Sequence, residues 1–203
     1  MLCDMQCTPT LSRTIAAPSV LAGAAALIAS LGPAAAPAAN EAATATLTVH
    51  RISVQGVGNS VGAITLRDSP HGMLVIPNLT GMGEARPHAA HIHENGTCRP
   101  AERDGGMVAG AAAGGHYDPA DTGEYTGPYL PGALGDLPNL YVEPGGRSTI
   151  PVLAPRLSVK DVRGHALMIH ARADRYGPRT AEHGHGDHAH GGARAYCGVV
   201  PER

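Results

Sequence analysis

Short stretches of alternating apolar and polar residues run through most of the chain after residue 44, a pattern typical of half-buried β-strands. In residues 45–54 the apolar positions are odd-numbered up to Val49 and even-numbered at Ile52 and Val54, which predicts a strand with a bulge or bend. Further strands are predicted at 61–69, 72–79, 87–94, 148–155, 165–171 and 195–200.

The spacing of these strands is close to that of hairpins, and Gly58-Asn59 is a turn signal between the first two. The pattern favours an all-β antiparallel sandwich or barrel, with helical character only in a possible turn at 158–164. Residues 95–146 and 172–192 show almost no periodicity. Loops that only connect secondary-structure elements are usually short, so we predict that these two long stretches are functional loops.

Composition supports a loop-rich β protein, since the 203 residues include 27 glycines and 17 prolines. Phe and Trp are absent, so the core must be built mainly from aliphatic side chains and methionine. The formal net charge is −2 and no long basic run is present, so nothing favours a nucleic-acid partner.

The N-terminal segment differs in kind from the rest of the chain. Residues 15–39 are apolar and uncharged, Arg13 precedes them, and Ala36-Pro37-Ala38 has the A-x-A form of a cleavage site. We interpret residues 1–38 as a secretory signal peptide and 39–203 as the mature domain, exported to the periplasm. A transmembrane anchor is the alternative, but prolines and glycine interrupt the apolar stretch, so no stable membrane anchor is expected.

Export leaves two of the four cysteines, Cys98 and Cys197, in an oxidising compartment. One disulfide is therefore expected, closing a loop of about 100 residues and stabilising the fold by about 4 kcal/mol. Two buried free thiols are the alternative.

Histidines supply the candidate chemistry. His91 and His93 are two residues apart on a predicted strand, so they point the same way with Cα atoms about 6.6 Å apart, while Ile92 faces the core. A single pair of this kind is a weak signal. His116, among glycines, and His170, at the end of an apolar strand, bring the number of candidates to four. Four imidazoles without thiolates suit copper or zinc.

Several motifs follow one another along residues 45–200: HIHENGTC, AGGHYDPADTG, LGDLPNLYV, VLAPRLS, ALMIHARAD and RAYCGVV. In this order they resemble the motifs of the bacterial exported copper,zinc superoxide dismutases. The resemblance implies a flattened eight-stranded antiparallel Greek-key β-barrel with two long active-site loops. It also implies an enzyme that converts superoxide, a small anion, to dioxygen and hydrogen peroxide with copper as cofactor.

The resemblance assigns roles residue by residue. Arg194 matches the guanidinium that attracts superoxide, and Asp174 matches the carboxylate that hydrogen-bonds a copper ligand and a zinc ligand. Cys98 and Cys197 match the family's disulfide. The implied copper ligands are His91, His93, His116 and His170, with His116 also bridging to zinc.

The zinc site departs from the family pattern. Tyr125 and Ala133 occupy the positions of two histidine ligands, and Asp136 and His116 are the zinc-site residues that remain. Alanine cannot ligate a metal and tyrosine is a poor zinc ligand at neutral pH. We therefore expect copper, with zinc weakly bound or absent at the usual site.

A histidine-rich insertion at 182–192 adds four histidines to the second long loop, a composition typical of metal binding. It could capture copper or zinc and deliver it to the site, have only incidental affinity, or supply replacement zinc ligands, and we rank the hypotheses in that order. The added residues are His183, His185, His188 and His190.

Two classes of function remain open. The first is the superoxide dismutase, and the alternative is a non-catalytic copper-binding or metal-storage protein on the same fold. Arg194 favours the enzyme, because a storage protein does not need a group that attracts anions. A purely structural β-sandwich would explain none of the candidate residues. The sequence allows a monomer or a homodimer.

Overall fold

A computed structural model describes residues 42–176 and 191–203, all of which lie in the unit Asn40–Arg203. The expected signal peptide at 1–38 and residues 182–190 of the histidine-rich tract lie outside the described residues. Within the described ranges, no helix is long and apolar enough to cross a membrane.

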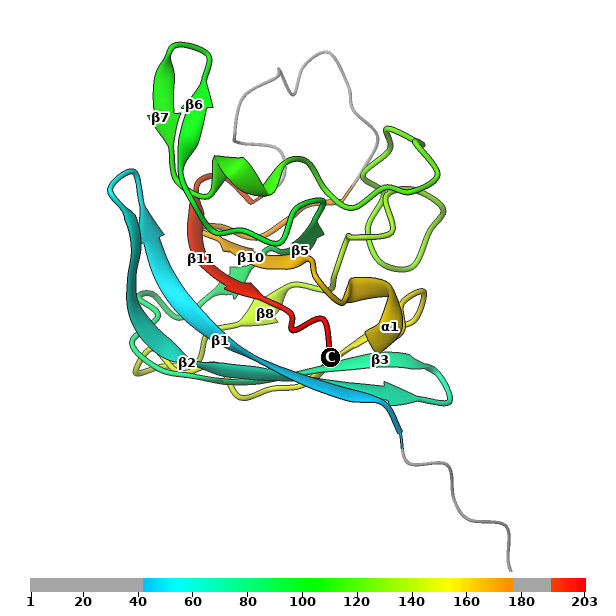
Figure 1. The fold of residues 1–203 in the computed structure, drawn as a ribbon. Helices are drawn as coiled ribbons and strands as arrows, with labels where there is room; N and C mark the ends of the chain where they lie inside the picture. The colour runs from blue at the N-terminus through cyan, green and yellow to red at the C-terminus, as the bar shows by residue number, and fades with distance from the viewer. Residues whose placement is uncertain (1–41, 177–190) are drawn as a thin grey trace, which may run out of the picture. The chain divides into compact units, whose positions relative to one another are not determined.

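The fold is built from antiparallel strands, which confirms the all-β prediction (Figure 1). Seven strands form one sheet in the order β5-β10-β11-β1-β2-β3-β9, and β4 pairs separately with β8. The sheet strands are β1 (Thr44–Ser53), β2 (Gly56–Ser69), β3 (Gly72–Leu79), β5 (Ala90–His93), β9 (Val152–Ala154), β10 (Ala166–His170) and β11 (Arg194–Val199).

The predicted irregularity in the first strand is confirmed. The register of β1 against β2 shifts on both sides of His50, and the buried positions change from Val49 to Ile52 across it. The turn prediction was wrong, however, because residues 58–59 lie inside β2 and the chain reverses at 54–55 instead. Val54 therefore lies in the turn and is 45% exposed instead of buried.

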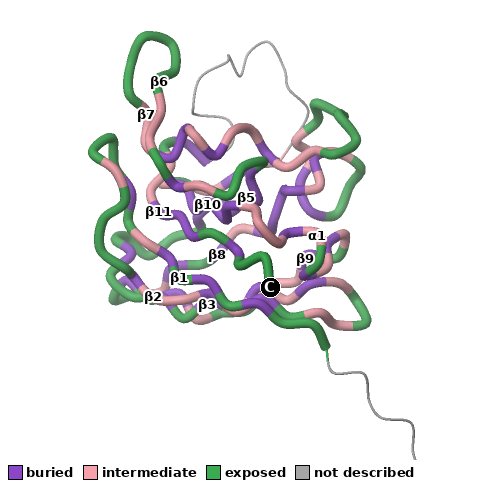
Figure 2. Tube along the Cα trace, in the orientation of Figure 1, coloured by how far each residue is buried: buried purple, intermediate pink, exposed green. Residues whose placement is uncertain are grey.

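The sheet curls so that β5, β10 and β11 lie over β1, β2 and β3 (Figure 1). Pairing between β11 and β1 is limited to His50–Cys197 and Arg51–Tyr196, where the sheet folds over. Hydrophobic residues of both layers form one buried cluster. Buried positions occur along both layers (Figure 2). Among the largest fully buried side chains are Leu47, Ile64, Leu66, Ile92, Leu167 and Ile169.

The two long stretches without periodicity are mostly loop, with a few short elements. The predicted strand 87–94 is interrupted at Ala89, which separates β4 from β5. The one α-helix of the described residues, α1, falls in the predicted turn at 158–164 and begins with a capping box between Ser158 and Asp161. The short elements are β4 (Pro87–His88), β6 (Ala101–Arg103), β7 (Gly106–Val108), η1 (Ala111–Ala113), β8 (Leu140–Tyr141) and α1 (Val159–Val162).

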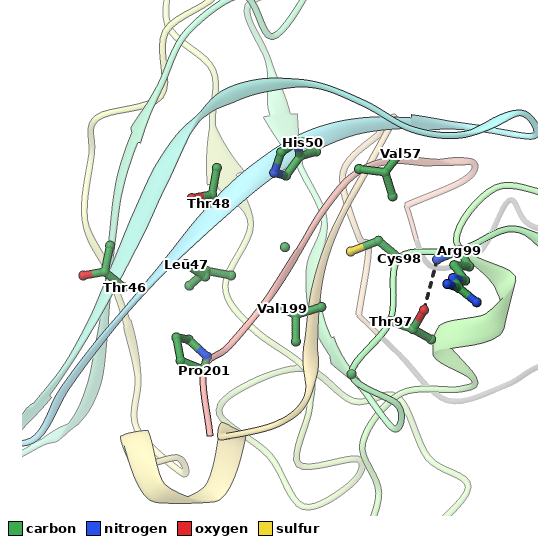
Figure 3. A pocket seen from close by; sticks show the side chains of 12 residues that line it. Thr46, Leu47, Thr48, His50, Val57, Thr97, Cys98, Arg99, Val199 and Pro201 are labelled. Carbon is green, nitrogen blue, oxygen red and sulfur yellow. Dashed lines mark hydrogen bonds between the residues drawn. The ribbon is translucent and has the colours of Figure 1, made fainter. Parts of the chain in front are cut away.

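The Cys98–Cys197 disulfide forms, which confirms the predicted pairing. It joins the start of the first long loop to β11 at a separation of 99 residues. An open groove of about 550 Å³ lies beside Cys98, lined by β1 and the C-terminal strand (Figure 3). None of the four candidate metal-binding histidines lines this groove.

Candidate metal centre

Three of the four candidate histidines come from two paired strands. His91 and His93 lie on β5, and His170 ends the neighbouring β10. All four residues of β5 are buried, with Ile92 in the core and the two histidines on the other face. The alternation of side chains along a strand thus produces the arrangement that was predicted for this pair.

The fourth histidine, His116, is brought in by the first long loop, which runs antiparallel along β5. The amide of Tyr117 donates to the carbonyl of Ile92 at 2.8 Å, and the amide of Ile92 donates to the carbonyl of Gly135 at 2.8 Å. A Cβ atom at Gly135 would lie 2.3 Å from the Ile92 oxygen, so this close approach requires glycine. The loop therefore places His116 beside His93, where they form an isolated β-bridge.

The four imidazole rings form one cluster. Ring centroids of His91 and His116 are 3.9 Å apart, and those of His91 and His170 are 4.8 Å apart. His93 lies 5.2 Å from His116 and 6.0 Å from His170. Nitrogen atoms of His91, His93 and His116 lie within 4.8 Å of one another, close enough to bind a single ion. His91 Nδ1 and His170 Nε2 also face each other at 3.1 Å.

Each imidazole ring has an inner nitrogen, which points into the cluster, and an outer nitrogen. The outer nitrogen contacts an acceptor outside the cluster. With the proton on that outer nitrogen, the inner nitrogen of every ring keeps its lone pair, which is the form that binds a metal. The outer contacts are His91 Nε2 to Asp174 Oδ2 (2.7 Å), His93 Nδ1 to Gly114 O (3.0 Å), His116 Nδ1 to Asp136 Oδ1 (2.8 Å) and His170 Nδ1 to Gly192 O (2.8 Å).

His93 provides the test of whether the cluster fits a metal. Its inner nitrogen, Nε2, is buried and has no hydrogen-bond partner among the described residues. Burial lowers the pKa of His93 well below its ordinary value, and the neighbouring His116, Arg194 and His170 lower the pKa further. A neutral imidazole with a buried, unpartnered lone pair fits a metal ligand, since burying that atom without a partner costs free energy.

The positions expected for zinc lie on the outer side of His116. Asp136 accepts the Nδ1–H of His116 through Oδ1 and the amide of Gly127 through Oδ2, at 2.8 and 2.9 Å. The Tyr125 ring packs edge-on against His116 with centroids 4.6 Å apart. Ala133 is fully buried and offers no ligand atom. The resemblance assigns Nδ1 of His116 to zinc, and in this structure that nitrogen donates directly to the Asp136 carboxylate.

Arg194, the predicted anion-attracting residue, lies close to His93. Its guanidinium donates to the carbonyls of Gly110 at 2.7 Å and Gly114 at 2.8 Å. The Gly114 oxygen also accepts the ring N–H of His93, so one carbonyl group links the arginine to the histidine cluster. Arg194 as a whole residue is half-buried.

Asp174 lies on the second long loop and is buried. One carboxylate oxygen accepts the N–H of His91 and the other accepts the amide of Tyr176 at 2.9 Å. Burial raises the pKa of Asp174. His88 donates from Nδ1 to the carbonyl of His170 at 2.7 Å, and its Nε2 is buried without a hydrogen-bond partner among the described residues.

A model of the copper/zinc superoxide dismutase family matches residues 60–200. The chain belongs to the copper/zinc superoxide dismutase family. A copper/zinc superoxide dismutase from Photobacterium leiognathi is 41% identical over 162 residues, which cover 79% of this chain and 90% of that protein.

Solved structures of superoxide dismutases share the fold. The copper/zinc superoxide dismutase from Brucella abortus is similar with a TM-score of 0.70 and 33% identity, covering 77% of this chain and 99% of that one. The monomeric copper, zinc superoxide dismutase from Salmonella enterica has a TM-score of 0.65 and 40% identity, covering 78% and 99%. The Greek-key β-barrel expected from the motifs is therefore confirmed.

Some groups that build the centre carry no sequence signal. The carbonyls of Gly114 and Gly192 orient His93 and His170, and a backbone oxygen is present in every residue. Arg156 lies in the VLAPRLS motif, yet the motif itself did not indicate that its side chain reaches the loop around residue 130. Such contacts are set by the path of the loop and not by residue type.

Proposed function

We propose that this chain is a copper-dependent superoxide dismutase whose metal is held by His91, His93, His116 and His170. The observation that supports this most strongly is the buried Nε2 of His93, which has no hydrogen-bond partner among the described residues and faces a cluster of imidazoles. Copper held by these four histidines would supply the one-electron redox chemistry that dismutation of superoxide needs.

The protein's part is to orient the ligands and to bring in the anion. Gly114, Gly192, Asp174 and Asp136 each hold one ring by its outer nitrogen, so the donor set is preorganised. Arg194 retains its charge over the whole working pH range and contributes a local positive potential despite the negative net charge of the chain. A small anion needs attraction more than a shaped cavity.

The test of the proposal is dismutation of superoxide by purified, copper-loaded protein. The family relationship supports the enzyme over a non-catalytic storage protein, and Arg194 beside the cluster supports it independently. Copper-loaded protein that leaves the superoxide lifetime unchanged would exclude the enzyme and leave the storage function.

For Arg194, we expect the Arg194→Ala variant to bind copper normally and to react with superoxide roughly tenfold more slowly. Its rate should also depend less on ionic strength, because salt screens the attraction between separated charges. Pulse-radiolysis rates at several salt concentrations measure both effects.

The matched control is Arg194→Lys, which keeps the charge but loses the fork that contacts Gly110 and Gly114. We expect this control to keep most of the salt dependence. If Arg194→Ala retained the salt dependence of the unaltered protein, steering by Arg194 would be wrong.

We further propose that zinc is bound weakly or not at all at the usual site. Ala133 has no donor atom, and tyrosine, the residue at position 125, is a poor zinc ligand. We expect metal analysis of chelator-treated protein to find copper with little zinc. A tightly held zinc in equal amount to copper would contradict this.

Export to the periplasm, with residues 1–38 as a signal peptide and 39–203 as the mature domain, is proposed on the sequence pattern. The Cys98–Cys197 disulfide supports an oxidising location. The role of the histidine-rich tract 182–192 in capturing metal is proposed on composition alone.

A further inference from the structure

Arg156 binds the first long loop through its backbone. Its guanidinium donates four hydrogen bonds to carbonyl oxygens within seven residues of that loop. The acceptors are Pro128 (from Nε, 3.1 Å), Gly132 (from Nη1, 3.0 Å), Gly127 (from Nη2, 3.2 Å) and Ala133 (from Nη2, 2.7 Å). We call residues 127–133 together with Arg156 the arginine clamp.

The clamp acts on the part of the chain where the zinc ligands have been lost. Its shortest hydrogen bond goes to the carbonyl of Ala133, one of the two altered positions. Tyr125, the other altered position, lies two residues before the clamp. The guanidinium holds this stretch by its peptide oxygens, and hydrogen bonds from a charged donor are stronger than neutral ones.

Two further contacts connect the clamp to the histidine cluster. Gly127 accepts from Arg156 with its oxygen and donates its amide to Asp136 Oδ2 at 2.9 Å. Asp136 in turn accepts the Nδ1–H of His116 through Oδ1 at 2.8 Å. The guanidinium is thus three hydrogen bonds away from the imidazole ring.

Gly127 is also confined on its other side. The Tyr176 ring lies so close that a Cβ atom at Gly127 would be 2.8 Å from two ring carbons. The backbone here has φ of 88°, a conformation that favours glycine. A peptide enclosed between a guanidinium and an aromatic ring has little freedom, so Arg156 fixes Gly127, whose amide donates to Asp136.

We propose that Arg156 is a positioning residue, which fixes residues 127–133 and thereby helps to hold His116 in the orientation needed to bind copper. This inference rests on the proposed function, namely copper at the four histidines with zinc weak or absent. Without the guanidinium, four carbonyls lose their donor and the loop shifts, so the carboxylate that accepts the N–H of His116 is displaced.

The test compares the Cu(II) forms of three variants by electron paramagnetic resonance. Arg156→Met removes the charge and donors, while His116→Ala gives the reference spectrum for copper without the fourth imidazole. Arg163→Met is the matched control, because Arg163 also donates to two carbonyls, those of Pro201 and Thr44, at sites outside the clamp.

We expect the Arg156→Met spectrum to shift toward that of His116→Ala and its copper to be released about 10-fold faster. Arg163→Met should match the unaltered protein in both respects. Where Arg156→Met does not fold, Arg156→Gln serves the same comparison, because its amide can satisfy at most two of the four carbonyls. If the variant that folds has an unchanged spectrum, the inference is wrong, even if its melting temperature falls.

The same samples separate this inference from the proposed function. If the unaltered protein binds no copper, or requires zinc for its copper spectrum, the proposed function fails. If it binds copper without zinc and the spectrum does not respond to residue 156, the clamp alone fails.

Discussion

We expect replacement of His93 by alanine to abolish tight copper binding and to reduce dismutation by about 100-fold or more. His93 offers the one inner nitrogen that is both buried and without a hydrogen-bond partner in the described part of the chain, so the site is organised around its lone pair. Its low pKa means that protons do not compete with the metal near neutral pH. Isothermal titration with copper and a superoxide assay measure the two effects.

His50→Ala is the control for this variant. His50 is a histidine of β1 whose ring contacts the carbonyl of Gly58, outside the cluster. We expect this control to bind copper and to react as the unaltered protein does. If His93→Ala retained both copper affinity and activity, the metal centre would have to lie elsewhere.

The second large effect is expected from removal of the disulfide. The Cys98→Ala/Cys197→Ala double variant should lose about 4 kcal/mol of unfolding free energy, since the crosslink closes a loop of about 100 residues in the unfolded chain. Domains of this size are stable by only about 5–15 kcal/mol, so this is a substantial fraction of the total. Urea unfolding followed by circular dichroism measures the loss.

The unaltered protein with its disulfide reduced provides the comparison. Both sulfur atoms then remain in place while the crosslink is cut, which separates the effect on the unfolded chain from lost packing at the fully buried Cys197. We expect the reduced protein to show most of the loss. Equal stability of the reduced and oxidised forms would show that the link adds nothing.

Periodicity in the sequence was sufficient to predict much of the barrel. The change of phase in β1 predicted the irregularity found at His50, because side chains alternate across a strand and an extra residue reverses the faces. The same rule placed His91 and His93 on one face with Ile92 in the core. The turn was misplaced because Gly58-Asn59, a local turn signal, lies at a register shift inside the long hairpin, while the chain reverses at 54–55.

Beyond the strands, the sequence by itself determined the chemistry available, and the tertiary structure decided how it is used. Residue types and motif order were enough to predict four histidines, one disulfide and the missing zinc ligands. Only the folded loops could show which groups form hydrogen bonds. Asp136 accepts from His116, and the carbonyl of Gly114 accepts from both His93 and Arg194. Arg156 donates to carbonyls of residues 127–133. The reason is physical: peptide oxygens are the same at every position, so the partners of a side chain among them depend on the path of the backbone in space.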